Sequence, residues 1–174
     1  MLTEVILVND NDEPLGVMEK MEAHKKGLLH RAFSVFIFNR NGEMLLQQRA
    51  ADKYHSPGLW TNACCSHPMP GEETIDAAHR RLLEEMGFDT ALKSAFDFTY
   101  KTAFDNGLTE HELDHVFIGS YDGEIFPDDE EVKDFSFMKI ETIRESIERH
   151  EQIYTSWFKI AFPKIEAYLN NEQA

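Results

Sequence analysis

The segment from residue 72 to residue 86 constrains the fold most, because it is the longest stretch with a clear helical period. Ile75, Ala78, Leu82 and Met86 recur three to four residues apart and form one apolar stripe. Acidic residues stand near its start, where the helix dipole favours negative charge, and Gly87 follows as a stop signal. The segment therefore predicts an amphipathic helix.

Short apolar or alternating segments flank this helix on both sides and predict strands. The alternation of Phe96, Phe98 and Tyr100 with polar residues is the clearest example. Together with the helix, these segments predict an α+β fold. No repeat or low-complexity linker divides the sequence, so one domain is expected over residues 1–174. Further strands are expected at residues 5–8, 33–38, 44–48, 108–121 and 132–138.

The C-terminal part predicts two more helices. Thr142 and Glu145 have the spacing of a capping box, so a helix is expected over residues 142–150. Thr155 or Ser156 is expected to cap a last helix, which Pro163 would kink. Residues 19–26 fit either a helical turn or a loop. Residues 50–70 show no period and contain several prolines, which is typical of a long functional loop.

The charge balance argues against some classes of partner. The sequence has 17 Lys and Arg against 32 Asp and Glu, a formal net charge of −15, whereas nucleic-acid binding needs a basic surface. No apolar run approaches the roughly 20 residues of a membrane span, and the first residues lack the features of a signal peptide. We expect no nucleic-acid or membrane partner, a cytoplasmic location, and a monomer or weak homodimer.

The polar face of the helix at residues 72–86 has a more specific pattern. Taken alone, it fits a solvated surface with an Arg81–Glu85 pair at i,i+4. The spacing is nevertheless similar to that of the Nudix box, in which a loop–helix–loop presents carboxylates to divalent cations that hold a diphosphate. The matching residues are Ser66, Glu72, Arg80, Leu82, Glu84, Glu85, Gly87 and Phe88.

Two positions depart from the Nudix box. Ser66 replaces its first glycine, and Arg81 replaces an expected acidic residue. Fewer carboxylates therefore remain to bind metal, which argues against an ordinary Nudix pyrophosphohydrolase, whose acids bind several ions. Such a hydrolase, acting on a nucleoside diphosphate derivative, is the alternative function. A non-catalytic module that binds phosphate or metal is a third possibility.

The loop sequence SPGLWTNACCSHP at residues 56–68 closely resembles the signature of type I isopentenyl-diphosphate isomerases, a Nudix branch. Residues 47–49, residues 110–112 and residues 154–157 extend the resemblance over most of the chain. It implies a Nudix-type α/β/α sandwich with a mixed β-sheet between helices. It also implies conversion of isopentenyl diphosphate to dimethylallyl diphosphate through a tertiary carbocation, in isoprenoid precursor biosynthesis.

Histidines and glutamates form a candidate metal site. Two glutamates that stand two residues apart on a predicted strand point to the same face. The resemblance implies Mn²⁺, Mg²⁺ or Zn²⁺ at a site made of His24, His30, His67, Glu110 and Glu112. The other histidines are expected to be structural or surface-exposed, namely His55, His79, His111, His115 and His150.

The same resemblance assigns the proton chemistry to a few side chains. Cys65 and Glu112 are expected to flank the alkene as acid and base, and Tyr100 to hydrogen-bond the carboxyl group. Trp157 would place its π-face against the cation, although its own pattern also fits a plain core aromatic. The two cysteines of the chain, Cys64 and Cys65, are adjacent and do not predict a disulfide framework.

Basic residues are expected to bind the diphosphate. The residues that match the family are Lys20, Arg49, Lys53 and Arg81. The departure at Arg81 then has a reason, because a cation replaces an acid where the phosphates lie. Glu85 and the carbonyl group of Cys65 are expected to hold a Mg²⁺ that bridges to the substrate.

The proposed chemistry also requires one particular strand register. The residues Asp105, Asn106 and Gly107 suggest a hairpin. A two-residue loop would turn Tyr100 away from Glu112, whereas an odd-length loop sets the two residues opposite each other and on one face. We predict the odd register, or a bulge that restores it.

Overall fold

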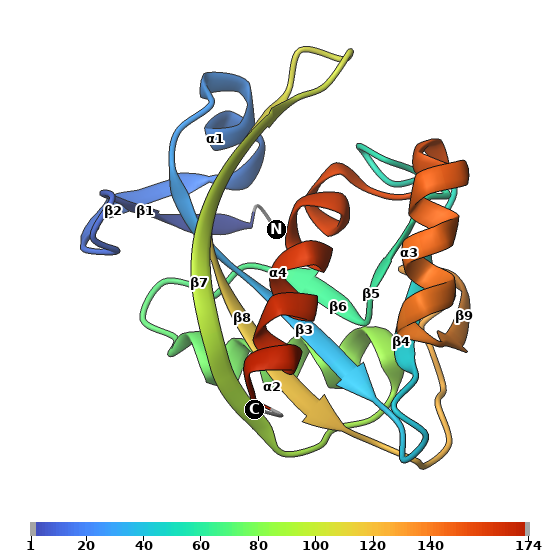
Figure 1. Cartoon of the computed structure of the whole chain (residues 1–174). Coiled ribbons are helices and arrows are strands. Elements are labelled where there is room, and N and C mark those ends of the chain that lie inside the picture. Colours follow the sequence, from blue (N-terminus) through green and yellow to red (C-terminus); the bar gives the residue numbers. More distant parts are fainter. Residues whose placement is uncertain (1–2, 173–174) are drawn as a thin grey trace.

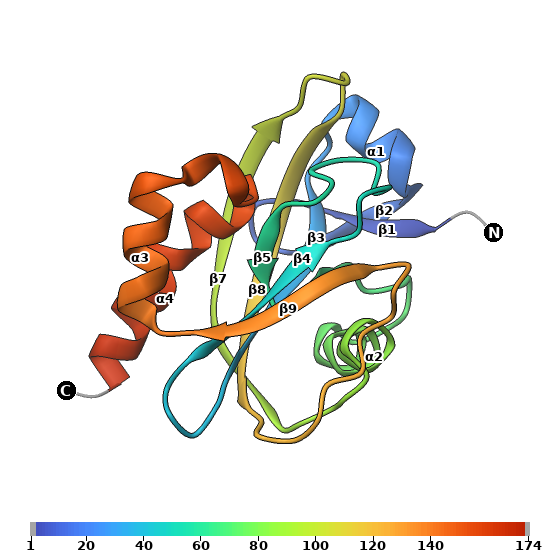
Figure 2. The same ribbon diagram turned by 90° about the vertical axis from the view of Figure 1, so that its right-hand side faces the viewer.

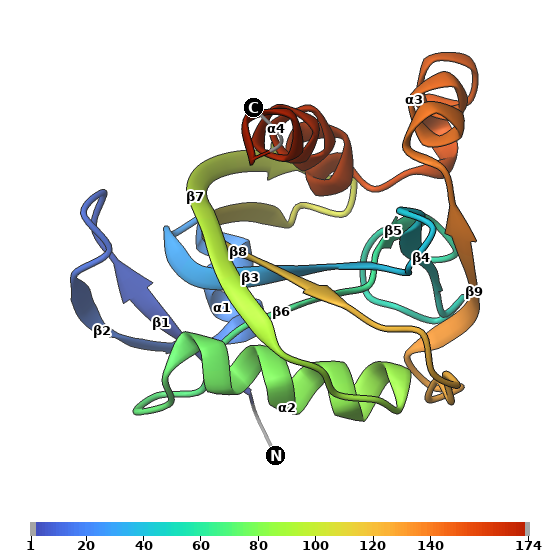
Figure 3. The ribbon, with the colours of Figure 1, turned by 60° about the horizontal axis from the view of Figure 1, so that its bottom comes forward.

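The computed structural model describes residues 3–172 of the chain. Its sheet lies between helix α2 (Thr74–Met86) on one face and helices α3 (Ile140–Arg149) and α4 (Ser156–Glu172) on the other (Figure 3). A short helix α1 (Lys20–Lys26) lies beside one end of the sheet (Figure 1). This arrangement confirms the expected α+β class and the α/β/α sandwich.

The sheet is mixed because strand β3 pairs in parallel with β8, while the other pairs are antiparallel. Strand β9 runs beside β4 with α2 on one side and α3 and α4 on the other (Figure 2). The strands are β1 (Glu4–Val8), β2 (Pro14–Glu19), β3 (His30–Phe38), β4 (Met44–Arg49), β5 (Trp60–Asn62), β6 (Cys64–Ser66), β7 (Leu92–Ala103), β8 (Thr109–Ser120) and β9 (Val132–Met138).

The register around β8 confirms the odd-loop prediction. In the β7–β8 hairpin Tyr100 stands opposite Glu112, and Ala103 stands opposite Thr109. In the parallel ladder with β3, His30 is the partner of the same Glu112. Because neighbours across a ladder share a face, Tyr100, Glu112 and His30 form one row across three strands.

Strand alternation divides most of the interior into two cores. Phe33, Val35 and Ile37 of β3 pack in the core that contains Leu82 and Met86 of α2. The intervening Phe36 packs on the other side of the sheet, in the core that contains Phe158 and Phe162 of α4. At roughly 25 cal/mol per Å² of buried apolar surface, these two cores are the main source of stability. The row of Tyr100, Glu112 and His30 lies at the end of the sheet nearest α1.

Side-chain capping explains where α1 and α4 begin. The Glu19 side chain accepts hydrogen bonds from the backbone of Met21 and Glu22, so the segment left open as turn or loop is helix α1. The Thr155 hydroxyl accepts from the Phe158 amide at 3.3 Å, which confirms Thr155 as a cap of α4. Helix α4 continues past Pro163.

Three predictions about local structure were wrong. The expected loop at residues 50–70 contains β5 and β6, because the edges of β4 and β3 supply hydrogen-bond partners for these short strands. Helix α3 begins at Ile140 after the N-cap Lys139, so Thr142 lies inside the helix and caps nothing. The chain enters α3 directly from β9, and this early start lets Ile143 become fully buried. Ile75 is 37% exposed, so the apolar stripe of α2 begins after it.

No helix within residues 3–172 combines the length and the apolar character needed to cross a lipid bilayer.

Candidate active site

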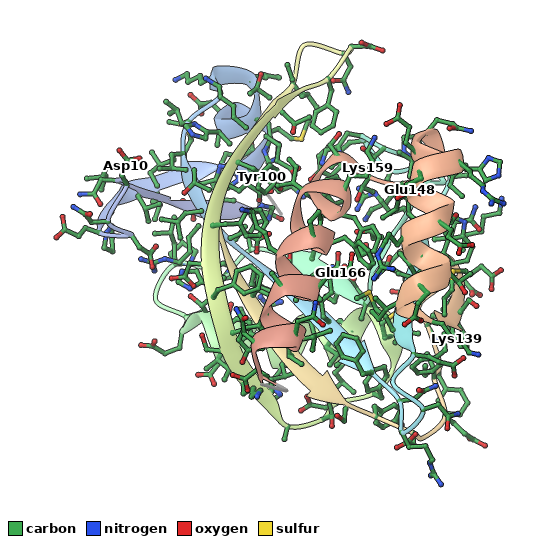
Figure 4. All side chains as sticks on the ribbon, viewed as in Figure 1. Asp10, Tyr100, Lys139, Glu148, Lys159 and Glu166 are labelled. Carbon is green, nitrogen blue, oxygen red and sulfur yellow. The ribbon has the colours of Figure 1, made fainter. Side chains whose placement is uncertain are left out.

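A narrow cavity lies on the α4 side of the sheet. Its walls come from β3, the end of β4 and the loop that follows it, β6 and the segment after it, β7, β8, and the start of α4. The predicted catalytic residues all line it, together with one predicted metal ligand from the segment after β6 and one from β8: Cys65, Glu112, Tyr100, Trp157, His67 and Glu110. Figure 4 marks Tyr100 on β7, the strand that brings it to this cavity.

Two buried histidines present a free nitrogen to this region. The Nδ1 atom of His24 lies 2.7 Å from the Lys20 carbonyl oxygen, and Nδ1 of His30 lies 2.9 Å from the Leu28 carbonyl oxygen. Each contact fixes Nδ1 as the protonated nitrogen and leaves Nε2 as an electron-pair donor. Within residues 3–172, neither Nε2 atom has a hydrogen-bond partner. This is the usual preparation of a histidine for metal binding, with the second ring nitrogen held by a carbonyl group.

The two predicted carboxylates face these imidazoles. Nε2 of His24 lies 3.7 Å from Oε2 of Glu110, and Nε2 of His30 lies 3.4 Å from Oε2 of Glu112. Nε2 of His67 lies 2.6 Å from the same Glu112 oxygen. Two ligand atoms at right angles around one ion, each about 2.1 Å from it, are about 3.0 Å apart. These separations are therefore close to those of a shared coordination sphere.

The residues present fit a divalent metal ion. Ligand atoms of His24, His30 and His67 all lie within 4.8 Å of one another. Mixed imidazole and carboxylate ligands suit Zn²⁺ or Mn²⁺. A bound ion would also serve as the partner that the buried nitrogens without hydrogen bonds lack. A cluster of His and Glu that can hold a metal is thus a property of the chain.

The electrostatics of Glu112 favour its ionised form. Burial alone would raise its pKa, but His67 and His30 together hold the pKa of Glu112 well below its usual range. Burial lowers the pKa of His67 in spite of the nearby carboxylate, so this ring is neutral at neutral pH, as metal binding requires. For His30, burial lowers the pKa, but the close carboxylate of Glu112 outweighs it and raises the pKa.

The Tyr100 hydroxyl connects the two carboxylates. It lies within hydrogen-bond distance of both Glu110 and Glu112. Burial, followed by the charges of these two residues, raises the pKa of Tyr100 well above its usual value, so the phenol keeps its proton. A neutral phenol between two carboxylates can donate to one and pass a proton to the other.

The adjacent cysteines point to opposite faces of β6. Cys64 is fully buried in the core against α2, whereas Cys65 lines the cavity. The Cys65 thiol donates to Oδ1 of Asn62 at 3.1 Å, and Oγ of Ser34 lies 3.5 Å from its sulfur. Burial raises the pKa of Cys65, so it carries its proton at neutral pH. Strand alternation therefore selects which of the two thiols reaches the cavity.

Trp157 closes the cavity from the start of α4. Its side chain is buried, and the guanidinium group of Arg49 lies 5.2 Å from the ring centroid. The His55 ring meets it edge-on at 5.5 Å. Trp157 is thus both a buried aromatic of α4 and a wall of the cavity, so its two predicted roles are compatible.

A second, adjoining cavity gathers the predicted diphosphate-binding residues. Its lining contains Lys20, Arg49, Lys53 and Arg81, along with Glu85. The two cavities share Cys65 and His67 among their walls. Positive side chains therefore meet on one side of Cys65 while the carboxylates and imidazoles meet on the other.

The charges in this second cavity are partly compensated. Lys53 pairs with Glu131, and Nη2 of Arg81 donates to Glu85 at 2.8 Å. Burial, and then repulsion by Lys53, lower the pKa of Lys20. Burial raises the pKa of Glu85, even though Arg81 opposes this shift. A bound anion would relieve the crowding of cations here.

Three further polar side chains line the first cavity and were not predicted as site residues from the sequence: Ser34, His55 and Asp114. Asp114 is buried two residues after Glu112 and accepts a hydrogen bond from Ser34 at 2.7 Å. Burial raises the pKa of Asp114 well above its usual value. His55, expected to be structural or exposed, is buried in the wall of the first cavity. The period of β8 could have indicated Asp114, since residues 110, 112 and 114 share one face.

Comparison with known proteins decides the family. The NUDIX domain model matches residues 28–158. An isopentenyl-diphosphate Delta-isomerase from Pectobacterium atrosepticum is 54% identical over 169 residues, which cover 96% of this chain and 93% of that protein. The chain belongs to the isopentenyl-diphosphate Delta-isomerase family. A second member of the family, from Aromatoleum aromaticum, is 46% identical over 95% of this chain and 87% of its own length.

Solved structures confirm the fold of this isomerase family member. A protein from Deinococcus radiodurans superposes with a TM-score of 0.70 at 16% identity, over 84% of this chain and 90% of that chain. A MutT protein from Methanosarcina mazei gives a TM-score of 0.68 at 18% identity, over 84% and 96% of the two chains. At such identities the likeness concerns the fold alone.

Proposed function

We propose that the chain isomerises isopentenyl diphosphate to dimethylallyl diphosphate. The observation that carries this proposal is that Cys65 and the hydrogen-bonded pair of Tyr100 and Glu112 line one cavity, which adjoins a second cavity rich in Lys and Arg. The names of relatives with 46–54% identity support the same activity. The substrate joins an alkene to a diphosphate, and the two cavities offer one subsite for each part.

The reaction moves one proton onto the substrate and another off it. The π-electron pair of the alkene takes a proton at the terminal carbon, which leaves a tertiary carbocation. Loss of a proton from the neighbouring CH₂ group then forms the new double bond. Cys65 and Glu112 take these two roles, one as donor and the other as acceptor, and exchange them in the reverse direction.

Tyr100 and Trp157 support these proton transfers. Tyr100 donates a hydrogen bond to the carboxylate of Glu112, and its hydroxyl can relay a proton between that group and Glu110. Trp157 presents an aromatic ring to the cavity, where a π-face attracts a carbocation. The buried walls also protect the cation from capture by water.

The diphosphate and the metal ions occupy the flanking positions in this proposal. Lys20, Arg49, Lys53 and Arg81 bind the phosphate oxygens. Glu85, with the carbonyl group of Cys65, would hold a Mg²⁺ that accompanies the diphosphate. His24, His30, His67, Glu110 and Glu112 would hold Mn²⁺, Mg²⁺ or Zn²⁺, which supplies positive charge that fixes the ionisation of the carboxylates.

The biological setting belongs to the same proposal. We place the reaction in the cytoplasm, carried out by one domain over residues 1–174, as a monomer or weak homodimer without nucleic-acid or membrane partners. The net charge of −15 supports the lack of nucleic-acid binding.

Incubation with isopentenyl diphosphate and divalent metal in D₂O tests the function. Deuterium should enter the product, because the donated proton exchanges with solvent between turnovers, and NMR detects it. Phosphate release without isomerisation would instead identify a Nudix hydrolase. Absence of both reactions would favour a binding module.

The two cysteines provide a matched pair of variants for the same assay. Cys65→Ala should abolish deuterium incorporation while fold and metal content stay intact, because it removes a proton carrier from the cavity. Cys64→Ala changes a buried core residue and should keep turnover, at a stability cost of about 1 kcal/mol. Equal activity of the two variants would remove Cys65 from the mechanism.

A further inference from the structure

His55 approaches the proposed metal ligands from the loop that follows β4. Its Nε2 atom lies 3.0 Å from Oε2 of Glu110, and its ring lies 6.1 Å from the His24 ring. The side chain is buried. His24, His55 and Glu110 form a second group whose ligand atoms all lie within 4.8 Å of one another.

The close approach of His55 to Glu110 lacks the geometry of a hydrogen bond. Within the described part of the chain, neither ring nitrogen of His55 has a hydrogen-bond partner. Burying an imidazole with two orphaned nitrogens is unfavourable unless a ligand replaces the lost contacts with water. The separation of 3.0 Å is that of two ligand atoms at right angles on one ion.

The same carboxylate oxygen therefore faces two orphaned imidazole nitrogens. Oε2 of Glu110 is 3.0 Å from Nε2 of His55 and 3.7 Å from Nε2 of His24. An ion between these three atoms would satisfy all of them at once. Five protein groups leave one position of an octahedral site open, and His55 approaches this set of ligands through Glu110 and His24.

We propose that His55 is a ligand of the metal centre, which then has four imidazoles and two carboxylates. This inference rests on the metal centre of the proposed function. It also links the two cavities, because Arg49 donates to the His55 carbonyl oxygen at 3.1 Å and Lys53 stands on the same loop. Metal binding would then fix the loop that carries Lys53 and that Arg49 contacts.

A purely structural role for His55 makes a different prediction. Its ring stacks on Phe104 at 4.8 Å with an interplanar angle of 6°, and it meets Trp157 edge-on. Phenylalanine at position 55 would keep this packing and remove both nitrogens. His55→Phe therefore separates a ligand from an aromatic spacer.

The experiment measures Zn²⁺ affinity by competition with a chelator, without substrate. His55→Phe should raise the Kd at least tenfold, and His24→Asn should do the same, while His79→Phe on the surface should leave it unchanged. An unchanged Kd for His55→Phe beside a raised Kd for His24→Asn overturns the inference alone. An unchanged Kd for both variants overturns the metal centre itself.

Spectroscopy of the unaltered protein supplies a second measurement, which does not depend on a variant that folds. In the Zn²⁺-loaded chain with ¹⁵N-labelled histidine, four imidazoles should show the nitrogen shift of a metal-bound ring, one of them assigned to His55. Only three shifted rings, with His55 unshifted, would contradict the proposal.

Discussion

Tyr100 and Glu112 stand directly opposite each other on β7 and β8, and the tyrosine hydroxyl donates to the glutamate carboxylate. The same hydroxyl lies within hydrogen-bond distance of Glu110. A phenol has one proton, so it can serve only one carboxylate at a time as donor. The hairpin register thus places a group that can exchange a proton between two carboxylates.

Tyr100→Phe should lower kcat by about 10²-fold, because it removes this hydrogen bond while preserving the ring. Metal content should stay close to that of the parent protein, since no predicted ligand is lost. Tyr121→Phe is the matched control, because the Tyr121 hydroxyl donates to the carbonyl group of Glu124 away from the cavity. If both variants keep full kcat, Tyr100 has no role in proton transfer.

His24→Asn and His67→Asn should each lose the metal of the proposed centre. Ligand atoms of these two imidazoles lie within 4.8 Å of each other and of His30, and either change removes one donor. Metal analysis after dialysis should give well below one ion per chain in each variant. His79→Asn, at a half-buried histidine that contacts Asp89, should retain the ion. Full occupancy in His24→Asn and His67→Asn alike would exclude both residues from the site.

Trp157→Phe should retain more activity than Trp157→Leu. Both variants fill most of the buried volume, but only Phe keeps a π-face toward the carbocation. An electrostatic contribution of about 1–2 kcal/mol corresponds to a loss of roughly tenfold in kcat. Steady-state kinetics should show this difference in kcat. An equal loss in both variants would indicate that Trp157 acts through shape alone.

Glu72→Gln should make the free energy of unfolding less dependent on pH in the acid range. Both Glu72 oxygens accept from Arg80, at 2.8 and 2.9 Å, and this hydrogen-bonded pair lowers the pKa of Glu72. Because its pKa is lower in the folded state, ionised Glu72 stabilises the fold at pH values above its unfolded-state pKa of about 4.3. This contribution is lost as pH falls through the folded-state pKa. The variant should be less stable by about 1 kcal/mol at pH 7, and its difference from the parent protein should shrink as pH falls below about 4.3.

Denaturant unfolding at several pH values measures this difference. Glu130→Gln, at an exposed position, should show no comparable effect. A gap between Glu72→Gln and the parent protein that stays constant over the whole acid range would show that the carboxylate charge is not its cause.

Much of the site could be predicted because it depends on short-range periods. Glu110 and Glu112 share a face through simple strand alternation, and the choice between two hairpin registers fixed where Tyr100 points. The main helix was recognisable from its stripe, except that Ile75 lies outside the buried part. These features are properties of residues close together in the sequence.

The remainder depended on contacts between distant segments. Strands β5 and β6 have three residues each, too few to show a period, and exist because neighbouring strand edges complete their hydrogen bonds. A lone histidine in an irregular loop gives no sign of its surroundings, so the sequence predicts only that His55 is structural or exposed. Only the folded chain brings it beside Glu110.

The arrangement of the two thiols on β6 has a consequence for chemical targeting. Cys64 is sealed in the core, so a reagent of moderate size should mark the native chain at Cys65 alone. Burial also raises the pKa of Cys65, which makes it a slow nucleophile toward ordinary electrophiles. Selective covalent inhibition would therefore depend on delivery: a weak electrophile attached to a diphosphate mimic would be held beside Cys65 by Arg49 and Lys53, at high local concentration.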